Sequence, residues 1–322
     1  MANEAAWIKS EKANLEVGPT EKYAPGPHDI LIKTHAIAFN PLEASIQKLA
    51  IFPITYPAIL GSSLAGTVEA VGSAVTAFQA GDRVAASRSP TTIGDKRYGA
   101  YQRFALAASS SAAKLDPAVS FADAVSVITN VRTAAAALSV YLGLEKPVLD
   151  AAAPPARNEK VLIYGGSSSL GALAVKYAVD AGYAVTTTSS AANRALVEGL
   201  GPKHVLDHTV GAEALGKGLV ALGPFDANGG AGSWYTVLPS MGPESLPEGV
   251  ERRFQSFSSV LGEEGNQELR RWLVEVYVPE GLKRGKLGMV KVEKVKGGLE
   301  AIQGALDRLF ARVSGTKLVL EL

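Results

Sequence analysis

A strand, a glycine- and serine-rich turn and a helix follow one another directly in the middle of the chain. Lys160–Tyr164 has the character of a buried strand, and Leu170–Ala181 has the pattern of a helix that stops at Gly182. Between them lie Gly165, Gly166 and three serines, with Gly171 in the first helical turn. Small residues let the backbone approach a pyrophosphate, and the free amides and dipole of a helix N-terminus favour negative charge. The segment therefore predicts a dinucleotide site; the alternative is a turn that only joins strand to helix.

Strands and helices keep alternating after this turn. Ala184–Thr188 is rich in β-branched residues, and His204–Asp207 reads as a further strand. Helical patterns cover Asn193–Leu200 and Glu213–Leu222, and Leu269–Leu282 reads as another helix. Regular alternation of this kind predicts an α/β fold with a parallel, doubly wound sheet.

The chain before Ser120 is rich in strand patterns instead. Ile30–Ala38 alternates as a half-buried strand does, and Gly66–Val71 and Arg83–Ala86 are short strand candidates between turn residues. These patterns predict a compact β barrel or sandwich. Phe121–Leu142, with alanine and leucine at helical spacing, reads as a helix that marks the change of character.

The residues after the second strand of the alternating region bear on the choice of cofactor. A carboxylate there binds a ribose 2′-hydroxyl and favours NAD. The chain instead reads Thr188-Ser189-Ser190-Ala191-Ala192-Asn193-Arg194. Serine hydroxyls, an amide and the Arg194 cation are suited to a 2′-phosphate, so we expect NADP(H). Ser190 also suits a helix N-cap, and Arg194 suits a solvated surface equally well.

Composition excludes several classes of function. The 322 residues include 32 basic and 31 acidic side chains, and this balance argues against a nucleic acid or a membrane surface as partner. The absence of cysteine excludes disulfides, thiolate metal sites and a cysteine nucleophile. The chain start lacks a basic-then-apolar signal pattern, and no run of about 18 uncharged apolar residues occurs. We expect a cytoplasmic protein of two domains that acts on a small molecule.

Several further segments carry a family resemblance. They are Ala38-Phe39-Asn40-Pro41, Pro57–Gly61, Ala65–Val68, Val71-Gly72, Gly81-Asp82-Arg83-Val84, Gly99-Ala100-Tyr101, Thr133-Ala134 and Gly315–Val319. Together with the glycine- and serine-rich turn, they resemble the medium-chain dehydrogenase/reductase superfamily, in its zinc-independent quinone-oxidoreductase and enoyl-reductase branch. The resemblance covers most of the chain and is strongest to fungal members.

The resemblance implies a GroES-like β barrel domain, residues 1–127 and 286–322, and a Rossmann domain, residues 128–285, with the active site between them. It also implies cofactor contacts in both domains. With Arg194, these are Asn40, Thr129, Thr133, Gly165, Gly166, Ser167, Ser168, Leu170, Ser189, Ser190, Asn193, His208, Leu238 and Lys317. Helix capping is the alternative for Thr129 and Thr133, and a solvated edge-strand charge is the alternative for Lys317. Relatives commonly have tyrosine where His208 stands, which leaves open whether its ring stacks or forms a hydrogen bond.

Metal chemistry is judged from the same resemblance. Members that oxidise alcohols use a cysteine, a His-Glu pair and a second cysteine, whereas Asn40 and Gly61-Ser62-Ser63 stand in the first two places here. The four histidines are scattered, so no metal site is predicted. Without a Lewis acid, hydride addition to an activated C=C bond or to a quinone suits the site better than alcohol oxidation. The Asn40 amide is the candidate catalytic donor; Tyr56 and Tyr98 are candidate acids, with ordinary packing as the alternative.

One part of the chain is shorter than in related chains. After Phe225-Asp226 the relatives continue with a strand, a helix and a glycine turn, but only Ala227–Gly232 precedes the strand predicted around Trp234–Leu238. A parallel crossover with a helix needs at least roughly 10–12 residues, so one strand–helix unit is predicted to be missing. The loops Ser87–Lys96 and Pro239–Pro247 are expected to shape the substrate pocket.

Three functions remain open at this point. The first is a zinc-independent NADPH-dependent reductase of enones or quinones. The second is a trans-acting enoyl reductase that is a partner of a polyketide synthase. The third is a non-catalytic cofactor-binding relative, which the missing unit favours. A homodimer is a further expectation, by analogy with relatives alone.

Overall fold

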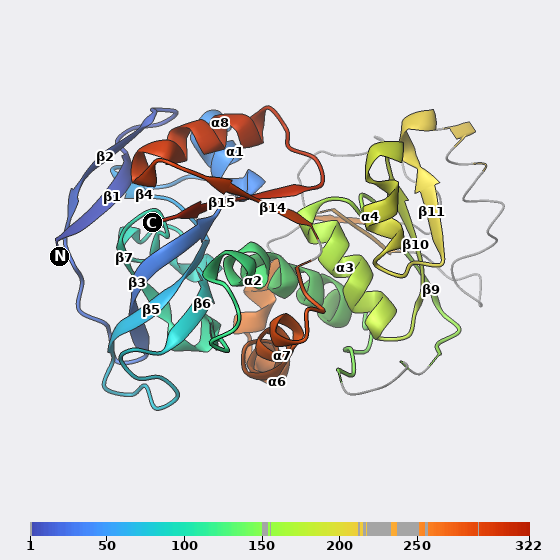
Figure 1. Ribbon diagram of the computed structural model, residues 1–322, viewed down its shortest axis with the longest axis horizontal. Helices are drawn as coiled ribbons and strands as arrows, with labels where there is room; N and C mark the ends of the chain where they lie inside the picture. The colour runs from blue at the N-terminus through green and yellow to red at the C-terminus, as the bar shows by residue number, and fades with distance from the viewer. Residues whose placement is uncertain are drawn as a thin grey trace. The chain divides into compact units, whose positions relative to one another are not determined.

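The computed structural model describes residues 2–149, 154, 156–211, 213–214, 217, 233–236, 251–254, 257–288 and 290–322. By their internal packing they form two compact units, Met1–Thr129 with Gln267–Leu322 and Asn130–Asn266. Figure 1 shows the elements of each unit with their labels.

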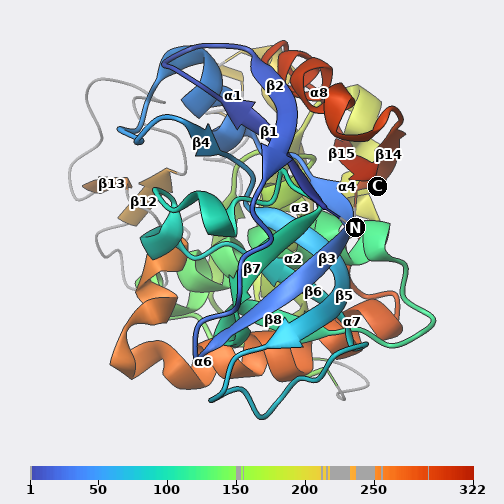
Figure 2. The same ribbon diagram turned by 90° about the vertical axis from the view of Figure 1, so that its left-hand side faces the viewer.

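The first unit is built around a mostly antiparallel sheet. Its strand order is β14 (Lys291–Val295), β15 (Thr316–Glu321), β3 (Asp29–Ala38), β5 (Ser63–Val71), β6 (Arg83–Ser87) and β8 (Ala112–Lys114), and β7 (Phe104–Ala108) pairs with β3. The three strands that the sequence predicts between residues 30 and 86 are confirmed, each within three residues of its predicted ends. Figure 2 shows these strands curving around the core of the unit.

The long strand β3 is buried on both of its faces. Side chains of a strand point alternately to opposite faces, and accordingly Ile30 and Ile32 join the main core of the unit while Leu31 packs with Phe104 in a separate cluster. Burial of each such side chain contributes roughly 1.5–3 kcal/mol. This double burial holds the strand, and the residues at its end, in a fixed position.

A smaller sheet and two helices complete the core of this unit. The sheet has the order β2 (Leu15–Thr20), β1 (Asn3–Ile8), β4 (Ala58–Ile59). Helices α1 (Pro41–Leu49) and α8 (Ile302–Phe310) pack against each other, as Figure 2 shows. Short 3₁₀ turns connect the elements; they are η1 (Pro90–Thr92), η2 (Lys96–Tyr98), η3 (Ser109–Ser111) and η10 (Gly298–Ala301).

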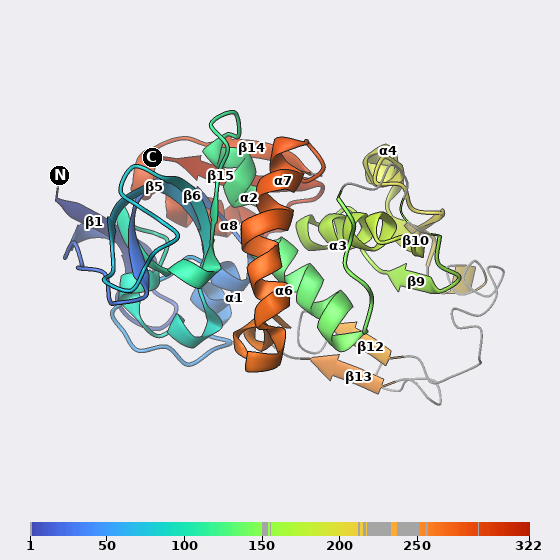
Figure 3. The ribbon, with the colours of Figure 1, turned by 90° about the horizontal axis from the view of Figure 1, so that it is seen from below.

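A helical segment also belongs to the first unit. It comprises α6 (Gln267–Trp272), the π-helical turn η9 (Leu273–Tyr277) and α7 (Val278–Lys283), which follow one another without a break, as Figure 3 shows. The helix that the sequence predicts here is confirmed. Its packing against β8 and η3 places it in the first unit, whereas the sequence expectation put residues up to 285 in the Rossmann domain.

The second unit contains the predicted parallel sheet. Strands β9 (Lys160–Ile163), β10 (Ala184–Ser189) and β11 (His204–Asp207) pair in parallel in the order β11-β10-β9. Helix α3 (Ser169–Asp180) packs on β9 and β10, and α4 (Arg194–Glu198) packs on β11. The short turns are η5 (Ala191–Asn193), η6 (His208–Val210), η7 (Phe257–Gly262) and η8 (Glu264–Asn266). Strands β12 (Ser233–Thr236) and β13 (Glu251–Phe254) form a separate parallel pair.

Helix α2 (Phe121–Ala135) continues into the π-helical turn η4 (Ala136–Tyr141), which confirms the long helix predicted over this stretch. Phe121–Tyr141 is the one helix of the described part that is long and apolar enough to cross a membrane, although the sequence reading found no such run. Of its most apolar window, 61% is buried inside the protein, as for the core helix of a globular domain. Length and composition alone are therefore weak evidence for a membrane span.

Several sequence predictions concern residues that the structure does not describe. The short link Ala227–Gly232, the cofactor contact Leu238 and the loop Pro239–Pro247 all lie outside the described residues. Of the helix predicted at Glu213–Leu222, the structure describes residues 213, 214 and 217. The predicted absence of a strand–helix unit stays a prediction.

Candidate functional site

The turn between β9 and α3 presents free amides at a helix N-terminus. Ser168 is the N-cap of α3, and its Oγ accepts a hydrogen bond of 2.9 Å from the Gly171 amide. Its carbonyl accepts from the Ala172 amide at 2.8 Å. The first amides of a helix have no acceptor within the helix. The amides of Ser169 and Leu170 are thus the ones left for an anion, and Leu170 is a predicted cofactor contact.

Two threonines of β10 hold this turn in place. The Gly165 amide donates to Thr188 Oγ1 and the Gly166 amide donates to the Thr188 carbonyl, each at 2.9 Å. The Thr187 hydroxyl donates to the Ile163 carbonyl at 2.6 Å. Both threonines are buried. The turn is fixed before any ligand arrives, which reduces the entropy that binding costs.

The glycines of the turn meet the steric needs of a diphosphate. Gly165 has φ +81°, and a Cβ built on it would meet no atom within 4 Å, so its outer side is open. A Cβ on Gly171 would lie 2.1 Å from the Gly165 carbonyl oxygen, and one on Gly166 would lie 2.4 Å from Thr187 Oγ1. The backbone is closely packed on its inner side and open on its outer side, which fits a phosphate-bearing cofactor.

The predicted 2′-phosphate residues gather after β10. Ser189 is buried and its hydroxyl donates to the Ser190 carbonyl at 3.1 Å, while the Asn193 amide lies 3.5 Å from Ser190 Oγ. Ser190 occupies the N-cap position of η5, but its side chain makes no capping bond, so capping does not account for its hydroxyl. Arg194 forms an ion pair of 2.8 Å with Glu198 and is half exposed.

His208 lies beside this group because β11 pairs with β10, with Asp207 opposite Ser189. Its ring is tilted by 44° against Tyr164, with centroids 5.9 Å apart, and its buried Nδ1 has no hydrogen-bond partner among the described residues. The Asp207 carboxylate accepts from the side chain and the amide of Thr209, and these hydrogen bonds lower its pKa. The Asp207 carboxylate near the predicted 2′-phosphate residues is therefore bound to Thr209. The Nδ1 atom of His208 can bind a ligand.

In the first unit, the ends of four neighbouring strands bring polar side chains together along one edge of the sheet, where these strands begin or end. The β15–β3 register pairs Val319 with Ala38, and its continuation places Lys317 opposite Asn40. Ser63 at the start of β5 pairs with Ser87 at the end of β6. Antiparallel neighbours necessarily end where their partners begin. Residues far apart in the chain thus meet at one site.

Hydrogen bonds join these side chains into one cluster. Lys317 Nζ donates to Asn40 Oδ1 at 2.5 Å, and Asn40 Nδ2 donates to Ser63 Oγ at 3.2 Å. Ser63 Oγ lies 2.6 Å from Thr129 Oγ1, which is also 3.1 Å from Ser87 Oγ and from the Ser62 carbonyl oxygen. We call Lys317, Asn40, Glu43, Ser63, Ser87 and Thr129 the edge cluster.

Glu43 completes the edge cluster from helix α1. One of its carboxylate oxygens accepts from the backbone amide of Asn40 at 3.1 Å, and the other lies 3.4 Å from the side-chain nitrogen Nδ2 of Asn40. Both oxygens of this buried carboxylate therefore face Asn40. The side-chain amide of Asn40 is engaged on both of its ends, so its role as a direct donor to a reacting oxygen is not what the geometry favours.

Lys317 differs from the alternative that the sequence allowed. It is only 3% exposed, because β15 lies between β14 and β3 and is not an edge strand. A solvated edge charge is therefore wrong for this residue. Burial lowers the pKa of Lys317 to about 8, and the charge of Glu43 acts in the opposite direction.

The capping alternative for the two threonines of α2 is also wrong. Ser120 caps this helix through a 3.0 Å bond from the Asp123 amide to its Oγ, and Thr129 and Thr133 lie in the interior of the helix. Their four-residue spacing places both on one helix face. Thr129 belongs to the first unit and Thr133 to the second.

Other candidates lie apart from these groups. Tyr98 donates its hydroxyl to Asp29 at 2.7 Å; burial and this bond raise its pKa to about 12, which suits packing and not proton transfer. No group of three or more His, Asp or Glu residues lies close enough to hold a metal ion within the described part of the chain.

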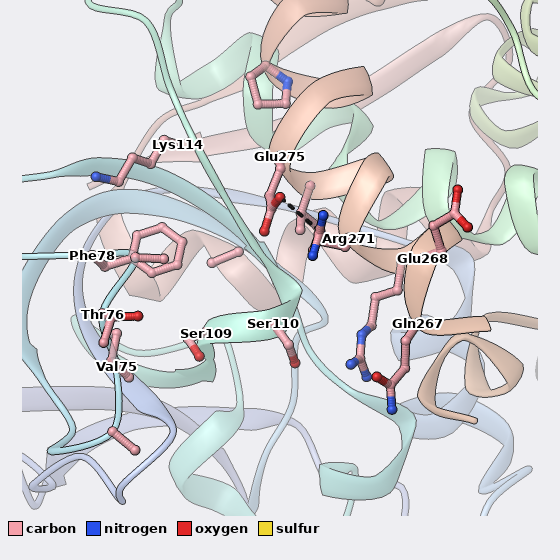
Figure 4. A pocket seen from close by; sticks show the side chains of 16 residues that line it. Val75, Thr76, Phe78, Ser109, Ser110, Lys114, Gln267, Glu268, Arg271 and Glu275 are labelled. Atoms are coloured by element: carbon pink, nitrogen blue, oxygen red, sulfur yellow. Dashed lines mark ion pairs between the residues drawn. The ribbon is translucent and has the colours of Figure 1, made fainter. Parts of the chain in front are cut away.

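A groove of about 670 Å³ lies within the first unit between the helical segment and β8 (Figure 4). Phe78 and Val274 contribute apolar surface, and Arg271 forms a 3.3 Å ion pair with Glu275 along its rim. None of the cofactor contacts that the sequence predicts lines this groove. It is thus separate from both candidate groups.

The sequence analysis missed three polar members of the edge cluster, namely Glu43, Ser63 and Ser87. For Glu43 a signal existed, because an Asn-x-x-Glu pattern at a helix start is a capping box. By resemblance Ser63 stands at a zinc-ligand position of relatives, and Ser87 stands at the start of a predicted pocket loop, but their contact could not be predicted, since they meet only through strand pairing. It also missed Thr187 and Thr188, whose role depends on the neighbouring strand.

Comparison with protein families and curated proteins identifies relatives of the chain. Residues 26–117 match the family described as alcohol dehydrogenase GroES-like domain. The chain is 33% identical to the dehydrogenase azaJ of Aspergillus niger over 350 residues, covering 99% of each chain. It is 31% identical to the trans-enoyl reductase himH of Aspergillus japonicus over 343 residues, covering 100% of this chain and 98% of himH. A protein of Emericella nidulans named as a zinc-binding alcohol dehydrogenase domain-containing protein is 30% identical over 340 residues, covering 99% and 98%.

Solved structures share the fold over the whole length. An alcohol dehydrogenase superfamily protein from Novosphingobium aromaticivorans matches with a TM-score of 0.79 at 22% identity, covering 99% of both chains. A mycobacterial protein solved in complex with NADPH matches with a TM-score of 0.76 at 23% identity, covering 100% of both chains. The alignments with azaJ and himH run over more residues than the 322 of this chain, so those relatives carry residues that this chain lacks.

Proposed function

Because the chain belongs to the medium-chain dehydrogenase/reductase superfamily, in the branch of quinone oxidoreductases and enoyl reductases, we propose that it is a zinc-independent, NADPH-dependent reductase. The proposed reaction transfers hydride to the activated C=C bond of an enone or enoyl substrate, or to a quinone. The cofactor-binding turn carries this proposal. Its amides at Ser169 and Leu170, its open outer side at Gly165 and its fixed attachment to Thr188 all suit a diphosphate.

The preference for NADPH rests on the residues after β10. Ser189, Ser190, Asn193 and Arg194 supply hydroxyl, amide and guanidinium donors, and the nearest carboxylate, Asp207, is bound to Thr209. Arg194 can exchange its exposed partner Glu198 for a phosphate, since an exposed ion pair contributes only about 0–1 kcal/mol. Nδ1 of His208 is a further donor to the same phosphate in the tautomer that carries its hydrogen on this nitrogen.

The substrate class follows from the chemistry of the edge cluster. A bound nicotinamide supplies the hydride, and the protein must stabilise the negative charge that develops on the substrate oxygen. At the positions where zinc-dependent relatives have ligands, this chain has Asn40 and the Ser62-Ser63 pair, and the side chains of Asn40 and Ser63 are hydrogen-bonded to each other. Hydroxyl donors suit an enolate or a hydroquinone, whereas an alkoxide needs a Lewis acid or a general base.

The name of himH supports the second candidate as far as enoyl reduction, and the synthase partner is part of our proposal. That function uses the same hydride chemistry and differs only in the carrier of the substrate. The residues that azaJ and himH carry and this chain lacks support the third candidate, a non-catalytic cofactor-binding protein. A cytoplasmic location and a homodimer are part of the proposal by analogy with the family.

Titration of the pure protein with NADPH and NADH tests the proposed cofactor. We expect saturable NADPH binding that is at least tenfold tighter than NADH binding. Arg194→Ala should weaken NADPH binding by roughly tenfold, about 1.4 kcal/mol, and leave NADH binding unchanged, because only NADPH carries the 2′-phosphate. Nicotinamide fluorescence measures both affinities.

Arg308→Ala is the matched control, since Arg308 also forms an exposed ion pair, with Glu293 at 2.6 Å, in the other unit. It should bind both cofactors as the wild type does. Equal losses of NADPH and NADH binding in Arg194→Ala would contradict the phosphate role. Failure of the wild type to bind either cofactor at millimolar concentration would contradict the proposed function.

A further inference from the structure

The ammonium group of Lys317 determines how the Asn40 amide is oriented. An ammonium has three donors and no acceptor, so the Asn40 atom 2.5 Å from it must be the oxygen. The Asn40 nitrogen then faces Ser63 and Glu43, both of which accept from it. A buried lysine thus removes the two-fold ambiguity that an asparagine side chain otherwise has.

This orientation fixes the direction of the next hydrogen bonds. Ser63 Oγ accepts from Asn40 Nδ2, which leaves the single hydroxyl hydrogen of Ser63 for Thr129 Oγ1, 2.6 Å away. Thr129 accepts that hydrogen and donates its own. Ser87 Oγ and the Ser62 carbonyl oxygen each lie 3.1 Å from Thr129 Oγ1 and can accept it. These bonds are longer than the usual 2.7–2.8 Å between hydroxyl and acceptor, so a better-placed acceptor competes with them.

Thr129 is also the member of the edge cluster most open to a ligand. Lys317, Asn40, Glu43, Ser63 and Ser87 are all buried, whereas Thr129 is partly exposed. Hydrogen bonds that run in one direction polarise each other, and a cation at the start of the chain increases this polarisation. The charge of Lys317 is therefore transmitted to the hydroxyl of Thr129, the partly exposed member of the edge cluster.

We propose that Lys317 is a positioning residue that makes Thr129 a directed, polarised hydrogen-bond donor to a carbonyl or oxyanion oxygen of the bound ligand. This role rests on the reductase function proposed above, in which such an oxygen gains negative charge during hydride transfer. Thr129 touches the ligand, and Lys317 acts only through Asn40 and Ser63.

The charges around Lys317 define the pH range of the effect. Burial lowers the pKa of Lys317 to about 8, and the Glu43 carboxylate on α1 opposes this change. The charge of Glu43 also acts on two other groups: it raises the pKa of Tyr101 in addition to burial, and it opposes the lowering of the pKa of Arg88 by burial. Above pH 8 the neutral amine of Lys317 can accept as well as donate, so the direction of the bonds is no longer enforced.

Two substitutions of Lys317 and two of Thr129, the first and last members of the hydrogen-bonded chain, separate this role from simple packing. Lys317→Met removes the charge and Lys317→Arg keeps it; Thr129→Val removes the hydroxyl and Thr129→Ser keeps it. Lys294→Met is the matched control, because Lys294 on the neighbouring strand β14 is exposed and paired with Glu321 at 3.0 Å. Loss of one buried charge while Glu43 stays behind destabilises a protein, so the fold of Lys317→Met is checked by thermal unfolding, and the ¹³C titration of the wild type tests the proposal without this variant.

Turnover of an enone at pH 7 should show coupling between the substitutions of Lys317 and Thr129. We expect Lys317→Met to lower kcat roughly tenfold and Thr129→Val to lower it roughly 10- to 100-fold. The double variant should be no slower than Thr129→Val alone, because without the hydroxyl the charge has nothing to polarise. Lys317→Arg, Thr129→Ser and Lys294→Met should retain most activity. Additive losses in the double variant would overturn the proposal.

The pH dependence gives a second readout. The wild-type kcat should fall above pH 8, whereas Lys317→Met should show a low, flat profile over the same range. The titration of ¹³C-labelled lysines in the protein without ligands needs no turnover. It should show one resonance, absent in Lys317→Met, that titrates well below the others. If Lys317 titrates with the exposed lysines, the positioning role is wrong. If the wild type turns over no enone or quinone, the proposed function fails whatever the lysine titration shows.

Discussion

Replacement of Gly171 by alanine is expected to remove most of the affinity for NADPH and to destabilise the second unit. The new Cβ would lie 2.1 Å from the Gly165 carbonyl oxygen and 2.9 Å from Ser168 Oγ, so the turn must move away from the start of α3. Overpacking of this kind costs roughly 1–3 kcal/mol of stability. Displaced amides should weaken NADPH binding by at least roughly tenfold. NADPH titration and thermal unfolding measure the two effects.

Gly304→Ala is the control for this substitution. Gly304 lies on the exposed face of α8, and its added Cβ would meet no atom within 4 Å. Alanine in a helix interior is favoured over glycine by about 0.5–1 kcal/mol, so this variant should be slightly more stable and bind NADPH normally. If Gly171→Ala bound NADPH as tightly as Gly304→Ala, the turn would not be the cofactor site.

Replacement of Arg88 by methionine is expected to cause the largest loss of stability in the first unit. The Arg88 guanidinium donates to three backbone carbonyls of the loop predicted to shape the substrate pocket and to one of β4. These are Ile59, Thr92, Ile93 and Asp95, at 2.7–3.2 Å. Burial lowers the pKa of Arg88 to about 10, so the side chain stays charged at neutral pH.

Methionine keeps much of the volume but leaves these carbonyls without their donor. The expected cost is about 2–4 kcal/mol, since unsatisfied buried polar groups are expensive. Chemical unfolding with urea measures it. Arg97→Met removes a guanidinium from the same loop that is paired with Asp95 in a more exposed position, and it should cost at most about 1 kcal/mol. Equal unfolding midpoints for the two variants would show that Arg88 does not hold the loop.

Local patterns were sufficient to predict some elements of both units, but not, for example, α1 or α8. The β-branched run before Ser189 and the glycine- and serine-rich turn gave β10 and the β9–α3 junction within one or two residues of the observed bounds. The parallel pairing of β9, β10 and β11 followed from their alternation with helices. Such features depend on contacts between residues close in sequence, which the periodicity of the chain records directly.

Contacts between residues distant in sequence could not be predicted, because the periodicity of the chain records only local contacts. The side chains of a strand point alternately to its two faces, so the sequence shows which of them share a face. It does not show that β15 inserts between β14 and β3 and buries Lys317. The Lys317–Asn40 bond joins residues 277 positions apart. Likewise, the apolar pattern predicted the helix at 269–282 but not that it packs on β8 and η3 of the first unit.

The central claim is that this chain catalyses hydride transfer from NADPH to an activated C=C bond or a quinone. Incubation of the protein with NADPH that carries deuterium at both C4 positions and a panel of enones and quinones, followed by mass spectrometry of the products, tests it most directly. The account predicts a saturated ketone that carries one deuterium at the carbon β to the carbonyl, with NADPH consumed in equal amount. Protein that binds NADPH but yields neither a deuterated ketone nor any reduced quinone would contradict the account and leave a non-catalytic cofactor-binding protein.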